Sequence, residues 1–156
     1  MGLFSFMKDA GEKLFGKKDE NASAEETSQH NQAAAQAIFD HINSLGLQWS
    51  NLMVNYDAGQ VTLTGQTPDQ ENREKIVLAA GNVDGVDNVS DQLEVSSPAA
   101  EAVFYTVVKG DTLSKIAAQH YGNANKYPVI FEANKPMLSH PDKIYPGQNL
   151  RIPPLA

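Results

Sequence analysis

The chain has 156 residues, a formal net charge of −7 and no cysteine. The lack of cysteine excludes disulfide frameworks, thiolate zinc sites and cysteine nucleophiles. The acidic balance argues against a protein that follows nucleic-acid phosphates, because such proteins present clustered lysine and arginine. No stretch approaches the roughly 20 apolar residues of a membrane-spanning helix. We therefore expect a soluble protein without stable membrane insertion and without a nucleic-acid partner, whose charged partners are cations.

Residues 1–15 form an N-terminal segment with apolar residues at helical spacing. Leu3, Met7, Ala10 and Leu14 would lie on one face of a helix. The lysines of this segment are matched by acidic residues, so it lacks the basic excess of helices that bind membrane surfaces. We expect a helix that docks on the middle domain. No apolar run here is long enough for a signal-peptide core, which predicts a cytoplasmic protein.

Polar stretches at residues 16–32 and 96–103 predict two linkers, because neither can bury much apolar surface. They separate a middle domain, residues 33–95, from a C-terminal domain, residues 104–153. Each domain is small enough to bury only a limited fraction of its surface. The chain is therefore expected to be an α+β protein of two small domains.

The middle domain begins with a pattern that predicts a helix and then a β-hairpin. Apolar residues at helical spacing precede Gly46, a typical residue after a helix end. Alternating apolar residues on both sides of Ala58-Gly59 predict the hairpin. Thr67 as a capping residue and Pro68 in the first turn predict a second helix that ends at Gly81. A last strand is expected over residues 86–95. This αββαβ order, with its glycines, resembles a BON domain.

The last third of the chain carries the most specific pattern. It begins with Phe-Tyr-Thr-Val-Val-Lys-Gly-Asp-Thr-Leu-Ser-Lys-Ile-Ala at residues 104–117 and closes with Ile-Tyr-Pro-Gly-Gln-Asn-Leu-Arg-Ile-Pro at residues 144–153. These segments resemble a LysM module, which implies a βααβ fold. Asp111 or Thr112 is expected to cap the first helix, and Pro128 is expected in the first turn of the second.

The LysM resemblance implies a groove for N-acetylglucosamine glycans such as peptidoglycan. By resemblance, one wall would comprise Gly110, Asp111, Thr112 and Leu113, and the other Ile144, Tyr145 and Pro146. The same residues also have local roles in a turn, a helix cap and the core, so they would persist in a module that binds no sugar. We favour a scaffold role and keep glycan binding as the alternative.

The sequence predicts that the protein is not an enzyme. Its four histidines are scattered, with no spacing suited to a shared metal site. The stretch Gly81-Asn82-Val83-Asp84-Gly85 lacks the Lys and Ser or Thr of a phosphate-binding loop.

The full length resembles the small bacterial cytoplasmic potassium-binding proteins of BON plus LysM type. The most distinctive stretches are residues 1–14, 80–86, 121–125 and 130–138. This resemblance implies selective potassium binding, with K⁺ as the ligand, and a cytosolic sensing or buffering role. A monomer that changes conformation on binding is expected.

Potassium gains selectivity from neutral backbone carbonyls that replace its water shell, so no carboxylate motif is needed. The C-terminal end of a helix leaves up to four carbonyls unpaired at the negative end of its dipole. The second helix of the middle domain ends at Gly81, and the docked N-terminal segment could complete a shell there. The positions that match the family's binding region are the main-chain oxygens of Met7, Ala10, Gly81, Val83 and Val86.

Overall fold

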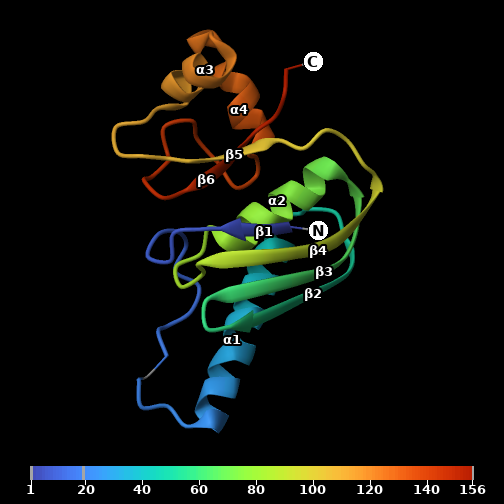
Figure 1. Cartoon of the computed structure of the whole chain (residues 1–156), viewed down its shortest axis with the longest axis vertical. Coiled ribbons are helices and arrows are strands. Elements are labelled where there is room, and N and C mark those ends of the chain that lie inside the picture. The colour runs from blue at the N-terminus through green and yellow to red at the C-terminus, as the bar shows by residue number, and fades with distance from the viewer. Residues whose placement is uncertain (1, 19, 156) are drawn as a thin grey trace.

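The protein consists of two α+β domains that lie one above the other in Figure 1, a computed structural model that describes residues 2–18 and 20–155. The predicted two-domain α+β class is confirmed. Positions 1 and 19, which fall inside the ranges predicted for the N-terminal helix and the first linker, lie outside the described residues.

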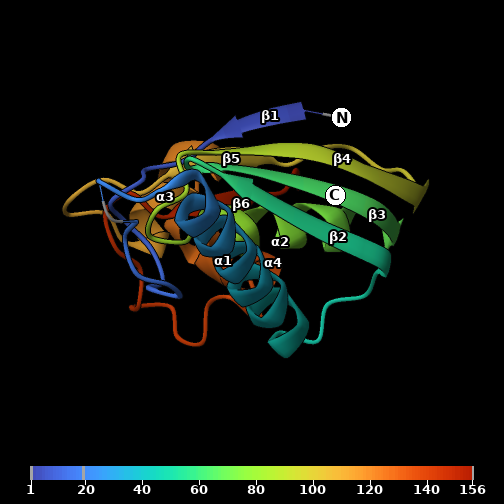
Figure 2. The same ribbon diagram turned by 90° about the horizontal axis from the view of Figure 1, so that it is seen from below.

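The N-terminal domain is a sheet with helices on one face (Figure 2). Its strands are β1 (Gly2–Ser5), β2 (Ser50–Asp57), β3 (Gln60–Asp69) and β4 (Asn88–Ser97), in the spatial order β1-β4-β3-β2. The helices are α1 (Ala24–Ser44) and α2 (Gln70–Gly81). Strands β3 and β4 are parallel, while the β2–β3 and β1–β4 pairs are antiparallel. The crossover α2 therefore ends beside the start of β4, where the candidate site lies.

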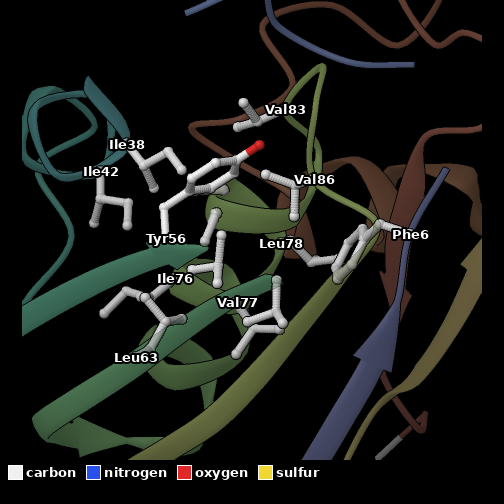
Figure 3. Packing of buried hydrophobic residues seen from close by; sticks show 14 of the residues in the cluster. Phe6, Ile38, Ile42, Tyr56, Leu63, Ile76, Val77, Leu78, Val83 and Val86 are labelled. Atoms are coloured by element: carbon white, nitrogen blue, oxygen red, sulfur yellow. The ribbon is translucent and has the colours of Figure 1, made fainter. Parts of the chain in front are cut away.

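The core of this domain lies between the sheet and the two helices (Figure 3). Ile38 and Ile42 of α1 and Leu63 of β3 are fully buried there. Along β3, buried residues alternate with less buried ones, as a sheet with one covered face requires. The predicted hairpin is present, and its turn places Ala58 and Gly59 at φ 49° and 89°, as a two-residue hairpin turn needs.

The C-terminal domain has the predicted βααβ order with its own core. It comprises β5 (Val103–Thr106), α3 (Leu113–Tyr121), the 3₁₀ turn η1 (Ala124–Lys126), α4 (Tyr127–Ala133) and β6 (Asn149–Ile152). Strands β5 and β6 pair antiparallel. Thr112 caps α3 by accepting a hydrogen bond from the Lys115 N–H, and Pro128 lies in the first turn of α4.

The helix predicted for residues 1–15 is wrong. Residues 2–5 form β1, which pairs with the edge of β4 and so satisfies backbone groups that β4 would otherwise present unpaired. The chain then continues in loops that contain Gly11 at φ 109°, a conformation no helix accommodates. The residues of the predicted helical face do not pack together, since Leu3 and Met7 are exposed while Leu14 packs partly buried against the core, and Phe6 is buried instead.

Several other boundaries differ from the prediction: β4 spans Asn88–Ser97 instead of residues 86–95, and β5 begins at Val103, so strand residues enter the predicted linker 96–103 at both of its ends. Helix α1 begins at Ala24, inside the predicted linker, because Ser23 and Glu26 form a reciprocal capping box. Helix α2 is capped by Asp69, whose carboxylate accepts a hydrogen bond from the Asn72 N–H. Thr67 is not the cap, because β3 continues to Asp69 in register with β4.

Buried polar contacts join the two domains. Arg151 on β6 forms an ion pair with Glu74 on α2, with Nη2 2.7 Å from Oε1, and both side chains are buried. Asn82, the residue after α2, pairs with the main chain of Asn149: its Nδ2 donates to the carbonyl at 2.8 Å, and its Oδ1 accepts from the N–H at 2.8 Å. Charged and amide groups bonded in this way fix one docking geometry.

Candidate functional site

The N-terminal loop after β1 lies along the loop between α2 and β4. The Glu12 N–H donates to the Asn82 carbonyl at 3.0 Å, and the Asp84 N–H donates to the Glu12 carbonyl at 2.9 Å. The Gly85 N–H donates to the Lys8 carbonyl at 2.7 Å. Two segments far apart in the sequence are therefore joined by main-chain hydrogen bonds into one unit.

Glycines make this close approach possible. A Cβ atom at Gly11 would lie 2.5 Å from the carbonyl carbon and oxygen of Asn82, and one at Gly81 would lie 2.1 Å from the Phe6 ring. Both distances are too short for a side chain. The Phe6 ring thus lies directly on the last residue of α2, and the loop backbone lies directly on Asn82.

The five predicted ligand residues fall on these two facing segments. Met7 and Ala10 lie in the N-terminal loop, while Gly81, Val83 and Val86 end α2 and form the facing loop. The side chains of Val83 and Val86 are fully buried in the core. What these residues can offer a ligand is therefore their main-chain oxygens.

Several of these oxygens keep free acceptor capacity. The Met7 carbonyl accepts from the Ala10 N–H, and the Val83 carbonyl accepts from the Val86 N–H, each at 3.1 Å. A carbonyl has two lone pairs, so one such bond leaves room for a second partner. Among the described residues, no backbone bond outside helices and strands ends on the oxygens of Ala10, Gly81 or Val86. The arrangement can present several neutral oxygens to a cation.

A loop of the C-terminal domain also contacts the N-terminal loop. A Cβ atom at Gly147 would lie 2.8 Å from the Ala10 Cβ and 3.1 Å from the Met7 Sδ. The neighbouring Tyr145 is largely shielded from water, and burial together with the charge of Glu12 raises its pKa to about 12. The predicted ion-binding segment therefore lies between the two domains.

Three carboxylates lie in or near the loop after α2. Asp87, Asp57 and Asp84 lie close enough to the Tyr56 hydroxyl to raise its pKa, in addition to the larger effect of burial. Within residues 2–18 and 20–155, however, His, Asp and Glu side chains form no group of three or more that could hold a metal ion. The negative charge lies around the loop and is not arranged as a side-chain ligand set.

The Asp111 and Thr112 side chains of the predicted glycan groove are engaged within the chain. The Asp111 carboxylate accepts from the Tyr105 hydroxyl at 2.6 Å and from the Val108 N–H at 3.0 Å, and these bonds lower its pKa. Thr112 caps α3. Leu113 is buried, and Ile144 packs partly buried against the same core. Gly110 and Pro146 are exposed, but the Gly110 carbonyl accepts a hydrogen bond from Lys115 Nζ.

Sequence reasoning missed three residues that shape the candidate site. Asn82 connects the facing loop to β6, Gly147 contacts Met7 and Ala10, and Tyr56 donates a hydrogen bond to the Gly85 carbonyl at 2.9 Å. All three act across large sequence separations. The only local signal was glycine itself, since Gly147 adopts φ 90°.

Two family descriptions match the chain: the BON domain at residues 30–97 and the LysM domain at residues 105–153. Nothing in the described helices is both long and apolar enough to cross a membrane.

Among curated proteins, the chain is similar to the potassium binding protein Kbp of Escherichia coli, with 48% identity over 155 residues. That alignment covers 98% of this chain and 99% of that protein. An uncharacterized protein of Deinococcus radiodurans is 53% identical over 49 residues, which are 31% of this chain and 19% of that protein. An esterase of Mycobacterium tuberculosis is 50% identical over 48 residues, which are 31% of this chain and 10% of the esterase. Only the first of these three similarities extends over both domains.

Proposed function

Because the chain belongs to the family of the Escherichia coli potassium binding protein Kbp, we propose that it binds potassium ions. The observation that carries the proposal is the junction of the N-terminal loop with the loop after α2, where Glu12, Asp84 and Gly85 make inter-loop backbone hydrogen bonds. This junction brings the main chains of two segments together at the end of a helix, which supports a site built from carbonyl oxygens.

The proposed ligands are the main-chain oxygens of Met7, Ala10, Gly81, Val83 and Val86. Neutral carbonyls suit a large monovalent ion, because they replace its hydration shell without the strong field that favours smaller or divalent cations. The end of α2 adds the negative end of its dipole. The surrounding carboxylates of Asp57, Asp84 and Asp87 would raise the local cation concentration without coordinating the ion.

Ion binding would act as a conformational switch by stabilising this three-part junction. The N-terminal loop contacts the loop after α2 through backbone bonds and contacts the C-terminal domain at Gly147. An ion that binds only the assembled form stabilises it by RT ln(1 + [L]/Kd). A protein of this kind would report or buffer the potassium concentration of the cytoplasm, the compartment that the sequence predicts. Cell fractionation would test this location.

The LysM domain would then serve as a scaffold that covers the ion-binding segment. BON and LysM domains are binding modules, and neither supplies a catalytic constellation to this proposal. The second candidate function, binding of peptidoglycan, is supported by the LysM match itself. Co-sedimentation of the full chain with insoluble peptidoglycan would support it. Recovery of the protein only in the supernatant would oppose it.

Calorimetric titration of the full chain tests the potassium proposal. Chlorides of potassium, sodium and calcium should be compared at matched ionic strength, because screening alone changes the stability of an acidic protein. We expect saturable heats with potassium and much weaker binding of sodium and calcium. Equal binding of sodium and potassium, or no saturable binding, would contradict the proposal.

A further inference from the structure

Gly85 lies between two proposed ligand residues, and both of its polar main-chain atoms are occupied. Its N–H donates to the Lys8 carbonyl at 2.7 Å, and its carbonyl accepts from the Tyr56 hydroxyl at 2.9 Å. Its φ of 100° is one that side chains rarely adopt. The peptide units on either side of Gly85 are therefore fixed in orientation from two directions.

Tyr56 itself is held by a rigid element. It lies on β2 opposite Val61 of β3, and its side chain is 6% exposed. The Phe15 ring packs edge-on against it with centroids 5.2 Å apart, and the same Phe15 ring would contact a Cβ at Gly85. Figure 3 shows the hydroxyl oxygen of Tyr56 turned toward the loop that carries Val83 and Val86. A sheet residue thus anchors the middle of the loop.

The Tyr56 hydroxyl remains a hydrogen-bond donor under ordinary conditions. Burial has the largest effect and raises its pKa, the main chain of Gly59 opposes this shift, and the carboxylates of Asp87, Asp57 and Asp84 raise the pKa further. A phenol is already protonated at neutral pH with an ordinary pKa of about 10. The bond to the Gly85 carbonyl is therefore present throughout the physiological range.

We infer that Tyr56 is a positioning residue that sets the ion selectivity of the site. By holding the Gly85 carbonyl toward its own hydroxyl, it fixes the orientation and spacing of the flanking carbonyls of Val83 and Val86. Selectivity in carbonyl sites depends on the number of oxygens and on how far the cage can contract around a smaller ion. Without the hydroxyl, the Gly85 peptide can rotate, and the cage adapts to sodium. This inference rests on the proposed function.

The test is Tyr56→Phe, which keeps the buried ring and removes only the hydroxyl. Dissociation constants for potassium and for sodium should be measured by calorimetry on the full chain. The ratio of the sodium dissociation constant to the potassium dissociation constant should fall roughly two- to tenfold, the range expected from the net effect of one hydrogen bond. The matched control is Tyr105→Phe, which removes the hydroxyl bonded to Asp111 in the other domain and should leave the ratio unchanged. Melting temperatures without potassium show whether each variant is folded.

The possible outcomes distinguish a failure of the positioning role of Tyr56 from a failure of the proposed potassium binding. A reduced ratio in Tyr56→Phe alone supports the positioning role. An unchanged ratio in a folded Tyr56→Phe protein, with wild type selective for potassium, overturns that role and leaves the proposed function standing. A wild-type protein without preference for potassium overturns the proposed function, and the inference with it. A fall in potassium and sodium affinity by the same factor would show a merely structural role and also overturns the inference.

Discussion

The loop after α2 and the groove of the LysM domain differ in how their polar groups are used. In the LysM groove, Asp111 and Thr112 are engaged by hydrogen bonds to their own turn and helix. In the loop after α2, side chains such as Val83 are buried, while the oxygens of Gly81 and Val86 accept no backbone bond outside helices and strands within the described part of the chain.

The difference shows that a family motif and a ligand site need not coincide. The residues that make the LysM pattern easy to identify are explained by folding alone, since caps and turns need those residue types. The loop after α2 carries no motif, because its proposed ligand contacts only main-chain atoms. The two regions are coupled, however, since Asn82 and Gly147 join them through the N-terminal loop and β6.

The largest loss of stability is expected when the buried ion pair between the two domains is removed. Glu74→Ala removes the closest carboxylate from the buried Arg151, which keeps only the more distant Glu71 carboxylate at 3.8 Å and the Ala133 carbonyl, and it also removes the acceptor of the Ala102 N–H. Loss of one partner of a buried ion pair costs about 3–5 kcal/mol, so the free energy of unfolding in urea should fall by that amount. Glu132→Ala, which removes an exposed ion pair with Lys135, should cost at most about 1 kcal/mol. Equal losses in both variants would show that the domains do not depend on this contact.

A second test compares one glycine from each region. Gly11→Ala and Gly110→Ala both place a side chain at positive φ, at 109° and 92°. At Gly110 nothing lies within 4 Å of the new Cβ, so only backbone strain of about 1–2 kcal/mol is expected. At Gly11 the Cβ also collides with the Asn82 backbone, which raises the expected loss to roughly 2–4 kcal/mol.

The same pair of variants distinguishes the two regions by function. Melting curves in potassium and in sodium should show that Gly11→Ala loses the potassium-dependent stabilisation, while Gly110→Ala retains it. The reverse result would place the ion effect in the LysM domain.

The smallest effect concerns pH. Burial lowers the pKa of His41 below its ordinary value of 6.5, against the opposing charge of Glu12. The histidine of the unfolded chain therefore takes up a proton more readily than the folded one. The free energy of unfolding decreases as the pH falls from above the ordinary histidine pKa to the lowered pKa of folded His41. His41→Gln should therefore show a smaller fall in melting temperature than wild type between about pH 7.5 and about pH 5.5, a window that brackets the ordinary histidine pKa. His140→Gln, at an exposed position in the LysM domain, should behave like wild type. An unchanged pH response in His41→Gln would contradict this assignment.

The order of helices and strands from α1 onward could be predicted because periodicity and capping are local. Val61 and Leu63 alternate as a half-buried strand does, and Thr112 caps α3 as predicted. The early start of α1 was also readable, since Ser23 and Glu26 have capping-box spacing. The N-terminal strand was not readable, because its apolar spacing fits a helix and only the edge of β4 decides its conformation.

Part of the candidate site could be predicted from the sequence and part could not. The ligand positions in the loop after α2 followed from the resemblance and from the helix end at Gly81. The contacts that shape them, from Tyr56, Asn82 and Gly147, could not be predicted from the sequence. They depend on tertiary packing, because each side chain or glycine meets its partner across a large sequence separation.

Direct localisation of the ion tests the central claim. Rubidium stands in for potassium and scatters anomalously, so crystals of the full chain grown in rubidium chloride would locate the ion in an anomalous difference map. We predict one strong peak between the N-terminal loop and the loop after α2, surrounded by main-chain oxygens that include those of Met7, Ala10, Gly81, Val83 and Val86. A peak in the LysM groove or on surface carboxylates, with none at this junction, would contradict the account.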